Sequence, residues 1–253
     1  MENENINTLF TGQELHVLEV VDSTNNYAAM LLNTTNLAEG AVIMAHEQEG
    51  GRGQRGSKWH SQKGENLTIS IVYRPGFLSP KDQFLLSRIT AISVMETLET
   101  FGTKAEIKWP NDILAGEKKI AGILIENSFS GDKIKSSVIG IGLNVNQLEF
   151  PDEINATSLR QITGEKMDLH LVLNTLCSHL EKWYLKLREG QHVLIKKHYH
   201  NHLFRLGIPT EFKVEDEVIK GMITGTGDDG KLEVLFSDGQ KKQFDLKEIS
   251  LVI

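Results

Sequence analysis

Residues 47–73 read EQEGGRGQRGSKWHSQKGENLTISIVY, and this stretch decides which fold the glycine-rich part of the chain belongs to. Segment 51–56 fits the pattern G-x-G-x-x-G of dinucleotide-binding folds, and it nearly fits the P-loop pattern. In both of those folds a helix opens at the end of the glycine segment, so that the helix N-terminus meets the phosphate. Here residues 57–64 show no helical periodicity and lead into a strand expected at 67–73. The context therefore argues against both folds.

The long loop at 47–66 combines its glycines with the basic side chains of Arg52, Arg55, Lys58 and Lys63. Glycine lets backbone N–H groups approach a ligand closely, and arginine binds carboxylate or phosphate through paired hydrogen bonds. The loop is therefore suited to binding an anion. The alternative is a solvated surface loop whose charges serve solubility, and this segment alone leaves both interpretations open.

The composition is that of a globular protein with an acidic balance. Of 253 residues, 40% are hydrophobic, and the formal net charge of −7 argues weakly against a nucleic-acid partner. No apolar run approaches the ~18 residues of a membrane helix, and the start MENENINTLF lacks the pattern of a signal peptide. The single cysteine, Cys177, excludes an intrachain disulfide. These features predict a cytoplasmic protein that binds neither nucleic acid nor membrane.

Strands and helices are mixed without strict alternation before residue 207. Strands are expected at 14–21, 41–45, 67–73, 105–109, 120–126 and 138–145, and helices at 27–32, 79–102, 168–190 and 193–203. Ser79 and Asp168 are typical helix caps, and Gly102 and Gly190 are typical helix ends. The lack of a regular strand-helix-strand repeat predicts an α+β domain over residues 1–206.

The pattern changes after Gly207. Only short strands are expected there, at 211–214, 218–226, 232–236 and 243–246. The dipeptides Asp229-Gly230 and Asp238-Gly239 are strong hairpin signals between them. Residues 207–253 are therefore predicted to form a separate small barrel of about five strands.

Five further segments occur in a fixed order along the chain. They are Ser23-Thr24-Asn25, the stretch 47–59, KWPND at 108–112, KIAGILIE at 119–126 and GIGLNVN at 140–146. Taken together, they resemble the biotin–protein ligase family. The resemblance implies a mixed-sheet catalytic domain of the biotin/lipoate ligase type with a small C-terminal SH3-like β-barrel. With few residues before the first expected strand, it also implies the short form that lacks an N-terminal DNA-binding domain.

The resemblance implies an activity as well. Such enzymes activate biotin with ATP to biotinyl-AMP and transfer the biotin to a lysine of the biotin carboxyl carrier protein of a biotin-dependent carboxylase. ATP and biotin would be the substrates, with Mg²⁺ expected beside ATP although no dedicated metal ligands are visible in the sequence. The carrier protein would be the partner, and the enzyme would be a monomer or a homodimer.

Individual residues receive roles by the same resemblance. Lys119 and Arg52 would be the catalytic residues, because cations must bring a carboxylate close to a negatively charged triphosphate. Biotin would contact Ser23, Thr24, Asn25, Gln48, Gly51, Arg52, Gly53, Gln54 and Lys119. ATP or the adenylate would contact Arg55, Lys58, Trp59, Asn111, Gly140, Gly142 and Asn144. Asp112 would orient the acceptor lysine or a structural neighbour, and the sequence leaves that choice open.

One position departs from the family pattern. Many relatives carry arginine where this chain has Gln54, within the stretch that wraps the adenylate. A neutral amide removes one charge from that wall. Either Arg55 or Lys58 compensates, or the intermediate is held less tightly.

Several alternatives remain beside this interpretation. Each motif taken singly has a purely structural interpretation. Residues 110–112 would be an ordinary turn, Lys119 would face solvent and Trp59 would belong to a core. The run His198-x-His200-x-His202 suggests a metal site, but residues two apart on a helix point in different directions, which favours a solvated face. Lipoate or octanoate transfer is a related chemistry. Gln48 with Ser23-Thr24 argues against it, because these polar side chains suit the ureido group of biotin better than a plain acyl chain. A repressor that also ligates biotin would need a DNA-binding domain before the first strand.

Overall fold

The computed structural model describes residues 7–252, and residues 1–6 and 253 lie outside that description. A seven-stranded sheet organises the first part of the chain, with strand order β1-β2-β3-β7-β6-β5-β4. β1 and β2 pair in parallel and the other neighbours pair antiparallel, so the predicted mixed sheet of an α+β fold is confirmed. The strands are β1 (Leu15–Val21), β2 (Val42–Gln48), β3 (Leu67–Tyr73), β4 (Glu106–Lys108), β5 (Asp112–Ala115), β6 (Lys118–Ser130) and β7 (Lys133–Leu143).

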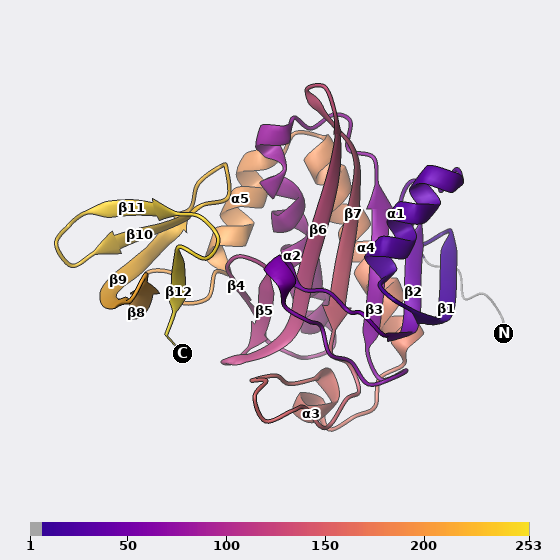
Figure 1. Cartoon of the computed structure of the whole chain (residues 1–253), viewed down its shortest axis with the longest axis horizontal. Helices are drawn as coiled ribbons and strands as arrows, with labels where there is room; N and C mark the ends of the chain where they lie inside the picture. Colours follow the sequence, from indigo (N-terminus) through magenta and orange to yellow (C-terminus); the bar gives the residue numbers. More distant parts are fainter. Residues whose placement is uncertain (1–6, 253) are drawn as a thin grey trace.

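Helices cover the two faces of this sheet unequally (Figure 1). They are α1 (Thr24–Thr34), α2 (Phe84–Thr100), α3 (Leu159–Thr163), α4 (Leu169–Arg188) and α5 (His192–Asn201). On one face, α1 packs on Ile43, Val72 and Val138 of β2, β3 and β7. On the other, α2 and α4 cover the larger core, which includes Ile71 and Ile139. Among the described residues α1 is the only helix that packs on this face, where it contacts β2, β3 and β7, so the neighbouring β6 part is the less covered.

Strand alternation explains which residues reach the open face. In β3 the apolar side chains at 67, 69, 71 and 73 join the larger core, so Thr68 and Ser70 point to the α1 side. The same alternation in β7 places Gly140 and Gly142 on the α1 side, in register with Ser70 and Thr68. Polar residues and glycines therefore stand side by side on the α1 face of β3 and β7, beside the first turn of α1.

Some elements differ from their predicted form. The single helix expected at 79–102 is divided into a 3₁₀ turn at Pro80–Asp82 and the helix α2. The reason is local, since the Ser79 hydroxyl donates to the Asp82 carboxylate (2.7 Å) and caps no backbone N–H. The short strand β5 was not predicted, because four residues after a turn carry too little periodicity to be distinguished from the turn itself. Asp168 caps α4 as predicted, accepting from the His170 N–H at 2.7 Å.

The C-terminal strands form one antiparallel sheet in the order β11-β10-β9-β8-β12. The strands are β8 (Pro209–Val214), β9 (Glu217–Thr226), β10 (Leu232–Phe236), β11 (Lys241–Phe244) and β12 (Ile249–Leu251). The sequence located four strands and predicted a barrel of about five. Five are present, β12 being the one that was not located, but the predicted closed barrel is wrong for residues 7–252. Its edge strands β11 and β12 have four and three residues, and an isolated bridge from Leu246 to Ile249 stands where a closing ladder would run.

This small sheet packs against the edge of the large one, next to β4 and α5 (Figure 1). Its buried Phe212, Ile223 and Val234 belong to the same hydrophobic cluster as Ile107 of β4. Buried Arg88 of α2 reaches across and donates to the Gly227 carbonyl at 2.7 Å. The two sheets therefore share one core, and the boundary at residue 206/207 stays a prediction from sequence. No helix in the described part of the chain is long and apolar enough to cross a membrane.

Candidate active site

A cavity of about 470 Å³ lies on the α1 side of the large sheet, at the border with the C-terminal sheet. Its size falls within the roughly 300–1,000 Å³ that is typical of small-molecule sites. The predicted residues that line it are Ser23, Thr24, Asn25, Gln48, Arg52, Gly53, Gln54, Lys58, Trp59, Asn111, Asp112, Lys119, Gly140 and Gly142. Residues as far apart in the sequence as Ser23 and Gly142 thus meet at one place.

Three predicted residues stand apart from this lining. Gly51 lines a neighbouring hollow that shares Arg52 and Trp59 with the cavity. Asn144 is buried and donates to the Thr157 carbonyl at 3.0 Å, so the structure does not bring it to the cavity wall. The side chain of Arg55 lies outside the described part of the structure.

One end of the cavity is built where the parallel strands β1 and β2 end together. Val21 of β1 is the register partner of Gln48 of β2, so the start of α1 and the Gln48 side chain become neighbours. The backbone N–H of Thr24 donates to Gln48 Oε1 at 2.7 Å, and the Thr24 hydroxyl donates to the same oxygen at 3.1 Å. With its oxygen engaged in this way, Gln48 keeps its amide nitrogen as a donor.

A second chain of hydrogen bonds continues from Thr24 along the sheet. Ser70 Oγ lies 2.8 Å from Thr24 Oγ1 and 2.6 Å from Asn25 Oδ1, so its single proton is shared between these two acceptors. Asn25 then donates to a carboxylate oxygen of Glu126 at 2.7 Å. Gly140 makes this possible, because a Cβ there would collide with the Asn25 side chain. This end of the cavity is therefore polar, preorganised and closely packed.

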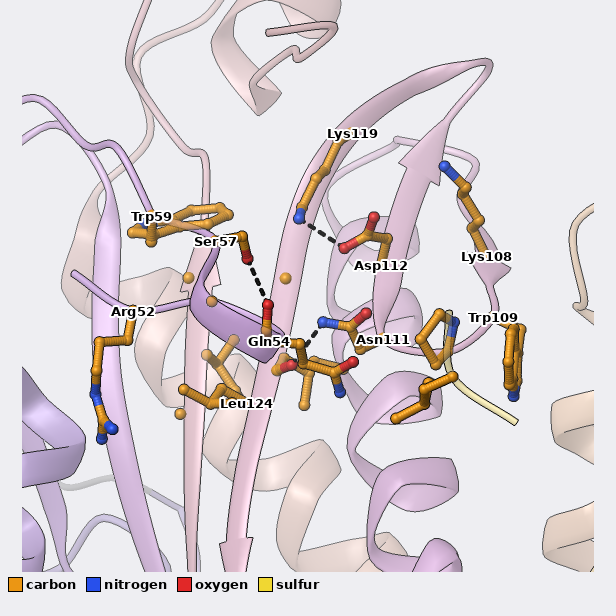
Figure 2. Close-up of a pocket in the computed structure, with 18 of the residues that line it drawn as sticks. Arg52, Gln54, Ser57, Trp59, Lys108, Trp109, Asn111, Asp112, Lys119 and Leu124 are labelled. Atoms are coloured by element: carbon orange, nitrogen blue, oxygen red, sulfur yellow. Dashed lines mark hydrogen bonds and ion pairs between the residues drawn. The ribbon is translucent and has the colours of Figure 1, made fainter. Parts of the chain in front are cut away.

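The other end carries a charged pair, Lys119 and Asp112, which Figure 2 shows joined across the β5–β6 hairpin. Lys119 Nζ lies 2.6 Å from Asp112 Oδ1, and both side chains are partly exposed. A β-bulge after Ile113 shifts the pairing, so that Lys119 stands opposite Leu114. Bulges re-aim side chains, and this one accompanies a lysine whose amine faces the cavity.

The glycine-rich loop folds back on itself and places Trp59 over the sheet. The Gly53 N–H donates to the Ser57 carbonyl (2.7 Å) around a 3₁₀ turn at Gln54–Gly56, and the Trp59 N–H donates to the Gly51 carbonyl (3.0 Å). The indole then lies on Gly142, where a Cβ would collide with the ring. Trp59 Nε1 is buried and has no hydrogen-bond partner among the described residues. The Lys119 amine stands 5.6 Å from the centre of the same ring.

Sequence reasoning missed part of the cavity wall. The missed residues include Ser57, Thr68, Lys108, Trp109, Leu124 and, from the C-terminal sheet, Phe212, Ile223, Leu232, Lys247, Ile249 and Leu251. Thr68 and Ser70 were detectable, because they are the polar residues at alternate positions of an otherwise apolar strand. The C-terminal residues carry no motif, and only the packing of the two sheets brings them to the site.

The side chains that could ligate a metal ion are dispersed over the described part of the chain. Within residues 7–252, no group of three or more His, Cys, Asp or Glu side chains is placed to hold a metal ion. In the histidine run, His200 bonds to Thr226 and His202 to the His198 carbonyl, while His198 lies 3.4 Å from Glu96. The three rings are half-buried, so the solvated face that was expected is wrong for this run.

The family model described as "Biotin/lipoate A/B protein ligase family" matches residues 17–144. This match covers half of the chain and includes the strands and loops that build the polar end of the cavity and the Lys119–Asp112 pair. The chain belongs to the biotin/lipoate A/B protein ligase family.

Particular relatives narrow the comparison. The chain is 35% identical to the "Bifunctional ligase/repressor BirA" of Bacillus subtilis, over 94% of this chain and 74% of that protein. It is 32% identical to the "Biotin--[acetyl-CoA-carboxylase] ligase" of Paracoccus denitrificans, over 85% of this chain and 92% of that protein. Among solved structures, the biotin protein ligase of Aquifex aeolicus in complex with biotin and ATP matches with a TM-score of 0.79 and 32% identity, over 95% and 99% of the two chains.

Proposed function

We propose that this protein is a biotin–protein ligase. It activates biotin with ATP to biotinyl-AMP and transfers the biotinyl group to a lysine of the biotin carboxyl carrier protein of a biotin-dependent carboxylase. The observation that carries the proposal is a single cavity with a hydrogen-bonding end at Thr24–Gln48 and a cationic end at Lys119. The relatives named for biotin ligation, and the similar structure that holds biotin and ATP, support it.

The polar end suits the fused rings of biotin. A ureido group has one carbonyl acceptor and two N–H donors, and it needs a matching set of partners when it is buried. Gln48 Nε2 supplies a donor at this end, the Ser23 hydroxyl can donate or accept, and the Thr24 hydroxyl oxygen can accept. We place the ring system here and the valeryl chain along the glycine face of β6 and β7, which leads toward Lys119.

The first chemical step is attack of a biotin carboxylate oxygen on the α-phosphorus of ATP. A new carboxylate–phosphorus bond forms, and pyrophosphate leaves with the electrons of the bond that breaks. Two anions approach each other in this step, so a cation positioned beside both lowers the barrier. Lys119 is the candidate for this role, and Asp112 holds its amine at the cavity wall before substrates bind.

The adenine base has a candidate partner in Trp59. Its ring is fixed against Gly142 by the fold of the glycine-rich loop and presents its other face to the cavity. Asn111 lies nearby and donates its amide to the Ile123 carbonyl at 2.9 Å, which orients its oxygen. We assign these two residues to the nucleotide, together with Lys58 and Gln54 of the loop.

Magnesium fits this site only as an ion carried by the triphosphate. Asp112 is the sole carboxylate among the described residues that line the cavity, and it is bonded to Lys119. Magnesium commonly uses one or two protein carboxylates together with substrate phosphates, and Asp112 would be the protein's contribution. When bound, the ion would neutralise phosphate charge.

The second step is attack of the carrier's lysine amine on the carbonyl carbon of the mixed anhydride. An amide bond forms, AMP leaves, and the amine gives up a proton. Asp112 is the candidate to accept that proton or to orient the amine, since it lines the cavity and already binds one ammonium group. The loop that carries Trp59 would limit the access of water to the anhydride.

Substrate-dependent pyrophosphate exchange tests the proposal. The purified protein is incubated with ATP and labelled pyrophosphate, and exchange is measured with biotin, with lipoate and with octanoate. Exchange that depends on biotin, followed by labelling of a carrier domain at one lysine, is the expected result. Exchange with lipoate or octanoate but not biotin would assign the chain to the other branch of its family.

A further inference from the structure

Arg52 makes an ion pair that its proposed role does not require. Its guanidinium Nη2 lies 3.1 Å from Oε1 and 2.9 Å from Oε2 of Glu126. Both side chains are about 42% exposed. Figure 2 shows the Arg52 side chain extending away from Lys119, so the guanidinium is outside the region where the two substrates would react.

Glu126 is the fixed member of this pair. It lies on the long strand β6, on the same face as Gly122 and Leu124, and it accepts from Asn25 at 2.7 Å. Asn25 is itself buried and held by Ser70. The carboxylate is therefore anchored to the sheet on one side. Arg52 comes from the glycine-rich loop, where its backbone is bridged to Lys58, and its long side chain reaches Glu126 at a half-exposed position.

Two acceptors compete for one guanidinium. Arg52 lines the cavity, and an arginine that binds the oxygens of a protein carboxylate cannot present the same N–H groups to a substrate oxyanion. Exposed ion pairs are weak, and their loss changes an equilibrium constant by roughly two- to fivefold. Such a pair holds Arg52 in place without preventing its capture by a better-placed anion.

We propose that Glu126 is a positioning residue that holds the Arg52 guanidinium at the cavity rim, away from Lys119, until a substrate oxyanion displaces it. The oxyanion is either the biotin carboxylate or a nucleotide phosphate. The proposal rests on the proposed role of Arg52 as an anion ligand. It adds that the measured affinity for the oxyanion is lower than the intrinsic affinity, because Arg52 must first separate from Glu126. The same holds for any site whose binding-competent conformation is only partly populated.

Glu126→Gln tests this directly, because glutamine keeps an acceptor oxygen for Asn25 and loses the charge that holds Arg52. The measurement is calorimetric titration of the full chain with biotin, with biotinol (an alcohol in place of the carboxylate) and with ATP. The ratio of the biotin affinity to the biotinol affinity is expected to rise roughly two- to fivefold in the variant. A rise confined to ATP would support the proposal with phosphate as the displacing anion.

Other results would overturn it. An unchanged ratio with unchanged ATP affinity means that no competition exists, and weaker binding of biotin relative to biotinol means that Glu126 aims Arg52 at the substrate. The ratio is informative even if the variant disturbs Asn25, because both ligands share the ring end. Wild-type protein that binds no biotin would contradict the proposed function instead, and is therefore measured first.

Glu47→Gln is the matched control. Glu47 lies in β2 just before the same loop, has the same 42% side-chain exposure as Glu126 and pairs with Lys63 at 3.5 Å. The Glu47→Gln substitution removes one negative charge near the cavity and leaves the Arg52–Glu126 ion pair in place. Equal tightening in both variants would reveal a general charge effect and refute the proposal. In an Arg52→Ala background, Glu126→Gln is expected to leave the ratio unchanged.

Discussion

Among single side chains, Lys119 is the one whose position has the most direct chemical consequence. Lys119→Ala is expected to slow biotin-dependent pyrophosphate exchange by raising its activation free energy by about 3–4 kcal/mol. The reason is that a preorganised cation acts mainly on the transition state. Biotin binding should weaken but remain measurable by calorimetry. Lys118→Ala is the control, since this neighbour is exposed and does not line the cavity. Exchange at the wild-type rate in Lys119→Ala would remove this residue from the mechanism.

Trp59 permits a graded test of the nucleotide site. Trp59→Ala is expected to raise the KM for ATP, since stacking on a base contributes roughly 1–3 kcal/mol, and to leave the affinity for biotin little changed. Trp59→Phe keeps a ring over Gly142 and should show a smaller effect. Steady-state kinetics with varied ATP distinguishes the three proteins. If all three share one KM for ATP, Trp59 serves only to cover the glycines of the sheet.

The attachment of the N-terminal segment to α4 depends on one carboxylate. Buried Glu181 accepts the backbone N–H groups of Leu9 (2.6 Å), Phe10 (2.8 Å) and Thr11 (2.9 Å). Glu181→Gln has one acceptor oxygen fewer and turns an NH₂ group toward these donors. We expect the free energy of unfolding in urea to fall by about 1–3 kcal/mol. Exposed Glu165→Gln is the control, and equal stability of the two variants would contradict the role of Glu181 as an anchor.

For the molecule as a whole, the shared core bears on whether the C-terminal sheet is separable. Phe212, Ile223 and Val234 are buried in the cluster that contains Ile107. Removing residues 207–253 would expose that apolar surface, so the truncated chain is expected to melt at a lower temperature and to aggregate. Thermal melting and soluble yield are the measurements. A soluble, cooperatively folding fragment 1–206 that still binds biotin would show that the sequence-based boundary is a true domain boundary.

The stability of the protein should depend on pH through His200 at the junction of the two sheets. Burial, with Arg88 and Lys196 nearby, lowers the pKa of His200, whereas Glu233 and the hydrogen bond with Thr226 oppose this. A histidine whose folded pKa lies below its unfolded value near 6.5 is protonated first in the unfolded state. Stability is therefore complete above about pH 6.5 and declines as the pH falls. His200→Gln should lessen this decline in urea unfolding between about pH 8 and pH 5, and an identical decline would exclude His200.

The sequence by itself determined the local features whose causes lie within a few residues. The strand at 67–73, the Asp168 cap and the irregular glycine-rich loop follow from periodicity and turn chemistry. The five motifs, through their resemblance to one family, predicted a common site for residues most of which line the cavity. Tertiary structure alone decided the rest. The C-terminal sheet is open because β11 and β12 each pair with an inner strand and not with each other, and the burial of Asn144 depends on its contact with Thr157. The Arg52–Glu126 pair joins residues 74 positions apart, and such partners are chosen by strand register and loop packing rather than by local pattern.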